Sequence, residues 1–230
     1  MTISIITCVN NFEEYEKNIT LEGAELIPID NTKNKYSAAQ ALNLGVKKAT
    51  NDLVVCCHQD VSFPAGWTKK LYINLEHAQR FSKNRIGILG TAGVLSNGAK
   101  RGYMQDGNYG YWNDEGGEKF GACQTLDECC LIFQKSSGLR FDEGFNDFHF
   151  YGADLCLQAL DNKLVNFGIA APIIHYSGGG ESSLKEGRET FVREMRKLKK
   201  KWIKKFGTIW TTTVILSKHR EVILADYIKR

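Results

Sequence analysis

The sequence has no long apolar segment, and no run approaches the roughly 18 residues that a membrane-spanning helix requires. It also has no basic start followed by an apolar stretch, so we expect no signal peptide. None of its seven cysteines belongs to a Cys-x-x-Cys pair, which argues against a zinc site or a disulfide framework. Cysteines in or beside apolar segments, as here, are typical of buried, reduced thiols. These absences predict a cytosolic protein.

The composition is that of an ordinary globular protein. The 230 residues, 43% hydrophobic and 24% charged, suffice for one large domain or for a domain with a tail. The formal net charge is only +4, but basic residues are concentrated near the C-terminus. There is no internal repeat and no low-complexity linker.

The first part of the chain alternates short apolar runs with helical patterns. A capping-box spacing joins Ser37 to Gln40, and apolar residues recur at helical intervals after Trp67. This alternation predicts an α/β fold with a mostly parallel mixed sheet flanked by helices. The expected strands are 3–9, 26–29, 53–57 and 85–90, and the expected helices are 12–19, one from residue 37 and one from residue 67.

The segment Asp52 to Trp67 organises this interpretation. Its apolar run, Leu53 to Cys57, predicts a buried strand, and His58 and Asp60 follow it directly. Ligands bind at the carboxyl edge of open α/β sheets, and side chains two residues apart point the same way in extended chain. Both groups are therefore placed to reach one divalent cation or one ribose. Alternatively, Asp60 only caps the next helix and His58 is an incidental loop residue.

The second part is less regular. Residues 93–121 are rich in glycine and tyrosine and show no clear period, which is typical of a functional or mobile loop. Tyr103, Tyr109, Tyr111 and Trp112 either stack on a ligand or pack this loop down. Strands are expected at 126–133 and 165–174, with a helix at 153–164 between them.

From about Ser183 the tail predicts one long amphipathic helix with a strongly basic face, most marked over residues 188–206. Three alternatives remain open for it. It lies on an anionic membrane surface as a peripheral contact. It packs its apolar stripe on the main domain and leaves its lysines in solvent. Nucleic-acid binding ranks third, because no recognised module accompanies the charge.

The order of these elements resembles a known family. ISIITCVNN, IPIDN, SAAQALNLGVKKATNDLVVCCHQD, TLDECCLIFQK, LRFDEGFNDFHFYGADLCLQA and PIIHYSGGGES are similar, in this order, to segments of the inverting family-2-type glycosyltransferases. Those enzymes have the glycosyltransferase-A (GT-A) fold, and the short bacterial members are the most similar. The resemblance runs from about Ile3 to Trp202.

The resemblance implies a nucleotide-diphosphate sugar as donor and a glycan or lipid-linked acceptor, as in surface-polysaccharide synthesis. It implies a catalytic domain over 1–182, with a nucleotide-binding half (1–95) and an acceptor half (96–182), before a helical extension over 183–230. No nucleic-acid partner is implied. An enzyme of this kind would work in the cytoplasm, with a possible peripheral position at the inner face of the membrane.

The resemblance also implies site residues. Asp60 and His175 would hold Mn²⁺ or Mg²⁺, since hard oxygen ligands and an imidazole suit these ions. The alternative for His175 is a hydrogen-bonded strand-end histidine. The remaining candidates fall into three groups: Thr7, Asn10, Asp30, Asn43 and His58 for the nucleotide sugar, Glu128, His149 and Trp112 for the acceptor, and Asp154 and Asp127 for catalysis.

Two departures from the family pattern bear on the chemistry. Its Asp-x-Asp motif reads His58-Gln59-Asp60 here, and the acidic pair expected before Asp154 reads Tyr151-Gly152. Asp154 is therefore the first candidate for the base, with Asp127 and Glu128 as the others. The alternative for Asp154 is that its charge only stabilises the N-terminus of its helix. The alternative for Asp30-Asn31 is that these residues only form a turn.

Two other functions stay open. A nucleotidyltransferase that forms sugar nucleotides shares the core and the metal, but Cys8 to Asn11 lacks the expected glycine-rich basic motif. A non-catalytic nucleotide-sugar-binding protein is the second, because Gly152 stands where an acid is expected.

Overall fold

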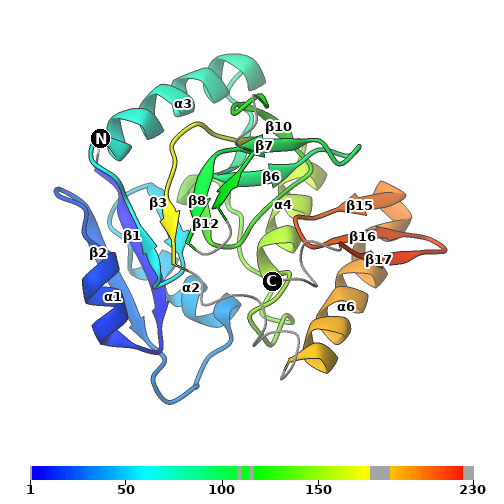
Figure 1. Ribbon diagram of the computed structural model, residues 1–230, viewed down its shortest axis with the longest axis horizontal. Helices are drawn as coiled ribbons and strands as arrows, with labels where there is room; N and C mark the ends of the chain where they lie inside the picture. The colour runs from blue at the N-terminus through cyan, green and yellow to red at the C-terminus, as the bar shows by residue number, and fades with distance from the viewer. Residues whose placement is uncertain (1, 108–109, 114–116, 177–186, 225–230) are drawn as a thin grey trace.

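The computed structural model describes residues 2–107, 110–113, 117–176 and 187–224 (Figure 1). The strands of its central sheet are, in chain order, β1 (Ser4–Val9), β2 (Glu25–Asp30), β3 (Leu53–Cys57), β5 (Ile86–Gly90), β10 (Gly121–Cys123), β12 (Cys130–Gln134) and β13 (Val165–Gly168). The α-helices are α1 (Phe12–Asn18), α2 (Ala38–Lys48), α3 (Trp67–Ser82), α4 (Tyr151–Asp161) and α6 (Arg188–Phe206).

The central sheet has the order β10-β13-β5-β12-β3-β1-β2. β1, β2 and β3 are parallel to one another, and β5 is parallel to β13. β12 lies antiparallel between β3 and β5, and β10 is antiparallel to β13. Five of the seven strands therefore run in one direction, so the predicted mostly parallel mixed sheet is confirmed.

Helices cover both faces of this sheet. α2, α4 and α6 share one hydrophobic core with alternate strand residues such as Val54 and Cys56. α1 and α3 share the other core with Leu53, Val55 and Cys57. All five residues of β3 are buried, which is why its sequence is an unbroken apolar run rather than an alternating one.

Helix α2 begins and packs as its sequence indicates. Ser37 accepts a hydrogen bond from Gln40 N–H, and the Gln40 side chain accepts one from Ser37 N–H, which completes the predicted capping box. A Cβ on Gly45 would lie 2.1 Å from Ile6 Cγ2. Glycine therefore lets this helix approach β1 closely.

The glycine-rich middle was expected to lack regular structure, and that expectation is wrong for about half of its described residues. It forms short strands that pair with distant partners, a kind of order that sequence periodicity does not reveal. They are β6 (Ala92–Val94), β7 (Lys100–Gly102), β8 (Met104–Asp106), β9 (Gly110–Trp112) and β10. One small sheet has the order β11-β6-β7, in which β11 is Thr125–Leu126. Another has the order β4-β14-β8-β9, in which β4 is Val61–Ser62 and β14 is Ile174–His175.

Two expected strands are each divided. The segment 126–133 forms β11 (Thr125–Leu126) and β12, with Asp127, Glu128 and Cys129 between them. The segment 165–174 forms β13 and then β14 (Ile174–His175), which pairs with β4 (Val61–Ser62). Both divisions place polar residues at the edge of the central sheet.

The extension contains more than the predicted helix. After α6 the chain forms an antiparallel sheet of β15 (Thr208–Trp210), β16 (Val214–Ser217) and β17 (Glu221–Ile223). α6 and this sheet lie together on the opposite side of the molecule from α1 and β2 (Figure 1). In the described part of the chain, no helix combines the length and apolar character needed to cross a bilayer.

Candidate functional site

Several strand ends meet at one edge of the central sheet. The parallel strands β1, β2 and β3 bring Asn10, Asp30 and His58 to their carboxyl ends. β12 runs the other way, and its first residue, Cys130, pairs with Cys57. The loop that carries Asp127 and Glu128 therefore reaches the same edge, where ligands bind in open α/β sheets.

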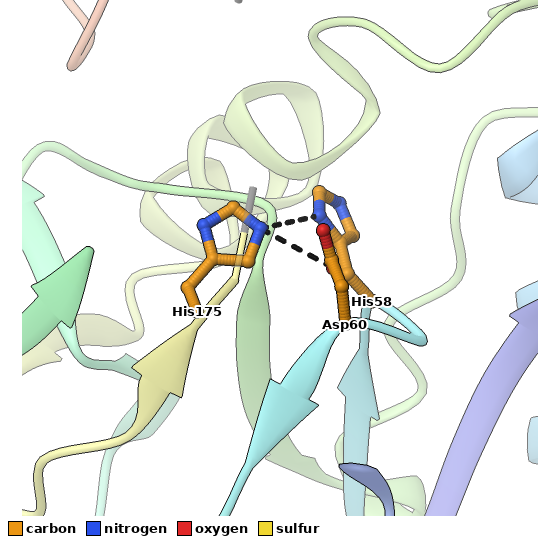
Figure 2. A group of neighbouring side chains, drawn as sticks. All are labelled: His58, Asp60 and His175. Carbon is orange, nitrogen blue, oxygen red and sulfur yellow. Dashed lines mark hydrogen bonds and ion pairs between the residues drawn. The ribbon is translucent and has the colours of Figure 1, made fainter. Parts of the chain in front are cut away.

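Three side chains converge there, as Figure 2 shows. His175 Nε2 lies 3.4 Å from Asp60 Oδ1 and 3.4 Å from His58 Nδ1. His58 and Asp60 follow β3, and His175 ends β14, which is more than a hundred residues further along the chain. The expected proximity of Asp60 and His175 is thus present, and His58 belongs to the same group.

Strand register fixes the position of His175. It pairs with Val61 on the antiparallel β4 and with Asp106 on the parallel β8. Tyr176 N–H donates to Asp60 O over 2.8 Å, which ties the two segments directly. The buried Nδ1 atom of His175 has no hydrogen-bond partner among the described residues and lies 3.8 Å from Asp106 Oδ2.

The electrostatics of the three groups are coupled. Burial alone would raise the pKa of Asp60, but the hydrogen bond and charge of His175 lower it to about 2. Burial alone would lower the pKa of His175, but Asp106 and Asp60 raise it to about 10. Burial and the neighbouring His175 lower the pKa of His58. The cluster therefore holds a carboxylate and one neutral imidazole against a positively charged one.

This donor set fits a divalent cation. Two imidazole nitrogens and one carboxylate oxygen all lie within 4.8 Å of one another. Adjacent ligands of an octahedral ion are about 3 Å apart when each is about 2.1 Å from the metal. A cation would take the place of the proton on His175 Nε2, the atom that faces Asp60 and His58, because metal ligands must be deprotonated. The three groups therefore need little movement to bind one.

No protein-family model matches the sequence, and no curated protein matches it. Solved structures do match. TarS 1–349 from S. aureus aligns with 88% of this chain and 66% of its own, at a TM-score of 0.50 and 10% identity. GalNAc-T7, solved with UDP, GalNAc and Mn²⁺, aligns with 90% of this chain and 48% of its own, at a TM-score of 0.56 and 9% identity.

This chain has the GT-A fold. It spans about two-thirds of the length of the TarS structure and about half of the GalNAc-T7 chain. At these identities the likeness establishes the architecture alone, so the reaction has to be argued from the site.

Within this GT-A domain, Asp60 does not cap the next helix. Helix α3 begins after Gly66, which lies in the left-handed region with φ 75°, and no side chain caps it. The capping alternative for Asp60 is therefore wrong. Gln59, between the two candidate ligands, points the other way and accepts hydrogen bonds from Asn10 N–H and Asn11 N–H. It fixes the loop that follows β1.

The structure adds residues to the site that the sequence did not indicate. Tyr151 Oη lies 3.2 Å from His58 Nε2, so the start of α4 orients this imidazole. Thr212, from the loop between β15 and β16, donates to Asp127 Oδ2 over 2.8 Å. Asp106 borders His175. Contacts between segments distant in sequence bring all three residues to the site, and no local sequence pattern indicates these contacts.

The candidates for nucleotide binding divide into two pairs. Asn10 and Asp30 are exposed at the carboxyl edge, where a nucleoside can reach them. Asp30 Oδ1 also accepts hydrogen bonds from Thr32 N–H and Oγ1, so the predicted turn is present. Thr7 is fully buried beside Cys57 Sγ, and Asn43 is bonded to the backbone of Phe141. Thr7 is therefore enclosed in the fold, and Asn43 is partly exposed but already hydrogen-bonded, so neither arrangement favours nucleotide contact.

The candidates for acceptor binding have different surroundings. His149 packs edge-on against Phe191, with ring centroids 5.3 Å apart. Trp112 Nε1–H donates to Arg101 O, and the ring of Tyr103 stacks on that of Tyr111. These contacts favour the alternative in which the aromatic residues pack the loop; Tyr109 lies outside the described residues. Glu128 accepts a hydrogen bond from Gly152 N–H over 3.0 Å, at the start of α4.

Asp154, the first candidate for the base, is fully buried and has strong partners. Its carboxylate accepts from Trp202 Nε1–H over 2.6 Å and from Gln158 over 2.8 Å, and Lys201 Nζ lies 2.8 Å away. A carboxylate held by these groups has no room for an acceptor hydroxyl. We therefore assign Asp154 a structural role, in which it joins α6 to α4.

The basic helix α6 packs on the main domain. Its apolar stripe of Phe191, Met195, Leu198 and Trp202 is buried, as in the packing alternative. Several of its basic residues form ion pairs with acids of this chain instead of being free in solvent. The pairs are Lys199 and Arg196 with Glu221, Lys201 with Asp142, Lys205 with Asp161, and Lys197 with Glu194. This arrangement does not favour membrane contact through residues 188–206.

Proposed function

We propose that the protein is a metal-dependent glycosyltransferase that moves a sugar from a nucleotide-diphosphate sugar to the hydroxyl of an acceptor. The observation that carries this proposal is the convergence of His58, Asp60 and His175 at the carboxyl edge of a GT-A sheet. Such a donor brings a negatively charged pyrophosphate to this edge, and further negative charge develops on the leaving group during the transfer.

The donor atoms indicate which cation fits. Two imidazoles suit Mn²⁺ better than Mg²⁺, which prefers an all-oxygen shell and several waters. When bound, the cation would neutralise the pyrophosphate and the departing nucleotide. Tyr151 holds His58 from the side opposite His175, so the ligand is oriented before the cation arrives.

Other residues take roles around this centre. Asn10 and Asp30 would contact the nucleoside from the ends of β1 and β2. Asp127, which Thr212 and Cys129 N–H hold in place, would orient the acceptor. We further propose inversion at the anomeric carbon, a glycan or lipid-linked acceptor, and a cytoplasmic role in surface-polysaccharide synthesis, as the family resemblance implies.

Calorimetry with UDP, GDP, CDP and dTDP tests this proposal, with Mn²⁺ or with EDTA. We expect at least one nucleotide to bind, and removal of Mn²⁺ to weaken it at least about tenfold, as loss of a charge-neutralising ligand should. Asp60→Ala and His175→Ala should each remove the Mn²⁺ dependence. Asp161→Ala, which removes a carboxylate paired with Lys205 on the surface, is the matched control.

The outcomes separate the alternatives. Absence of nucleotide binding would reject the transferase and the binding-protein functions together. A nucleotidyltransferase would release pyrophosphate from a nucleoside triphosphate and a sugar phosphate, whereas a transferase releases a nucleoside diphosphate from the donor. Unchanged Mn²⁺ dependence in Asp60→Ala would show that Asp60 is not a ligand.

A further inference from the structure

The start of helix α4 lacks a cap of its own. Its N-cap residue, Phe150, has no side-chain acceptor, and its φ of 64° is unusual for a bulky residue. The first N–H groups of a helix need an outside partner when they are buried. Glu128, from the loop before β12, supplies one, since its Oε1 accepts from Gly152 N–H over 3.0 Å.

Gly152 makes room for this carboxylate. A Cβ on Gly152 would lie 2.7 Å from Glu128 Cγ and 2.9 Å from Leu131 Cδ1, both shorter than real contacts. The side chain of Glu128 therefore fills the volume that a side chain on residue 152 would take. A carboxyl group reaches the start of the helix, but it comes from the neighbouring strand loop.

Glu128 differs from Asp154 in its charged partners. Among the described residues, no ion pair engages this carboxylate, whereas Asp154 on the same helix is paired with Lys201. Burial raises the pKa of Glu128 well above its ordinary value of 4.5; the hydrogen bond from Gly152 opposes this, and the adjacent Asp127 adds to it. A carboxylate in this environment binds a proton more readily than one in water.

The position of Glu128 relates it to the candidate metal cluster without making it a ligand. Tyr151, next to Gly152, contacts His58, and the charge of Asp127 acts on both His58 and His175. The group of possible ligands among the described residues contains His58, Asp60 and His175. Glu128 is thus not one of these possible ligands, and it lies at the start of α4, the helix whose Tyr151 contacts His58.

We propose that Glu128 is the general base of the transfer reaction, an inference that rests on the proposed function. The acceptor oxygen forms a bond to the anomeric carbon while the bond from that carbon to the phosphate oxygen breaks. The nucleoside diphosphate leaves with the electron pair, and the proton of the acceptor hydroxyl passes to Glu128. Water then takes this proton and restores the carboxylate.

Glu128→Gln tests the inference in the full chain. Its amide oxygen can still accept from Gly152 N–H, but it cannot take a proton. With Mn²⁺ and a panel of UDP-glucose, UDP-GlcNAc and UDP-GalNAc, water serves as acceptor and released UDP is measured. We expect turnover to fall at least about 100-fold, the usual range for a lost general base. The Kd for UDP with Mn²⁺ should stay within about twofold, since binding does not use the proton.

The control for Glu128→Gln is Glu143→Gln, the same change at an exposed carboxylate that bonds to Asn43. It should leave turnover unchanged. Turnover of Glu128→Gln within about threefold of wild type would overturn the inference and leave the proposed function intact. A wild-type protein that binds donor with Mn²⁺ but releases no UDP would instead contradict transfer itself, and the inference with it.

A relocated carboxylate gives a second test. Glu128→Ala removes the nearer of the two side chains that a residue at position 152 would meet, and the other contact is with the end of the Leu131 side chain. The double variant Glu128→Ala with Gly152→Asp can therefore place an acid from the helix in the same volume. We expect the turnover of this double variant to be at least about tenfold higher than that of Glu128→Ala. The turnover of Gly152→Asp alone should be lower than that of wild type, because the new aspartate and Glu128 would occupy the same volume. A folded double variant that recovers nothing counts against the inference.

Discussion

Helix α4 meets two carboxylates, one fully buried and one partly buried, that are used in opposite ways. Asp154, on its flank, is held by Lys201, Trp202 and Gln158. Glu128, at its start, is held by backbone N–H and has no cation among the described residues. One carboxylate is neutralised and fixes a tertiary contact; the other keeps its capacity for a proton. Burial alone therefore does not identify a reactive acid, and the partners do.

Sequence order alone points to Asp154 rather than Glu128 as the base. Asp154 stands in the first helical turn after a pair that is acidic in the similar family, so sequence order favours it as the base. Its side chain, however, points to α6, which the linear sequence places more than thirty residues away. Glu128 is distant in sequence from the helix start and adjacent to it in space.

The largest expected effect on stability is that of Asp154→Ala. It leaves the Trp202 N–H without its acceptor in the interface between α4 and α6, and leaves Lys201 paired with Asp142 alone. Removing one side of a buried ion pair typically costs about 3–5 kcal/mol, and the partial exposure of Lys201 places the loss near about 3 kcal/mol. Urea denaturation followed by tryptophan fluorescence measures this loss.

Asp161→Ala is the control for that variant. Asp161 also pairs with a lysine of α6, Lys205, but this ion pair lies at the surface. Such pairs contribute about 0–1 kcal/mol. Equal losses for the two variants would contradict the structural role of Asp154. Turnover of Asp154→Ala that falls far more than its folded fraction explains would return Asp154 to the catalytic candidates.

The second prediction concerns pH. Because burial raises the pKa of Glu128 above its unfolded value of 4.5, its contribution to stability is complete below pH 4.5 and is lost as pH rises through the folded pKa. Glu128→Gln does not titrate. The melting temperature of the variant relative to wild type should therefore rise from pH 4.5 to pH 8, measured without Mn²⁺. A difference that does not change with pH would show that Glu128 is not destabilised by burial.

Much of the fold follows from local sequence. The apolar run 53–57 and the capping box at Ser37 predict elements whose observed boundaries agree within a residue or two. The predicted meeting of Asp60 with His175 also holds, because Asp60 directly precedes β4, His175 ends β14, and these two strands pair. Periodicity and caps are local signals that the sequence shows directly. The order and direction of the strands then determine where the strand ends lie.

What the sequence does not reveal depends on pairing between distant segments. Asp106 borders His175 only because β8 pairs with β14, and both strands are too short to show a period. Thr212 reaches Asp127 because an unpredicted hairpin follows α6. Glu128 meets Gly152 because β12 begins where α4 begins. Each is a contact of side chains far apart in sequence, for which no spacing rule exists.

The smallest expected effect tests whether the C-terminal hairpin belongs to the site. Thr212→Val removes the hydroxyl that donates to Asp127 and keeps the shape of the side chain, so we expect a loss of about 1 kcal/mol in stability. If Asp127 orients the acceptor, turnover should fall a fewfold while the Kd for UDP with Mn²⁺ stays constant. Thr208→Val, on the same hairpin and remote from Asp127 in its contacts, should change neither. Equal effects of the two variants would mean that the hairpin supports the fold without reaching the chemistry.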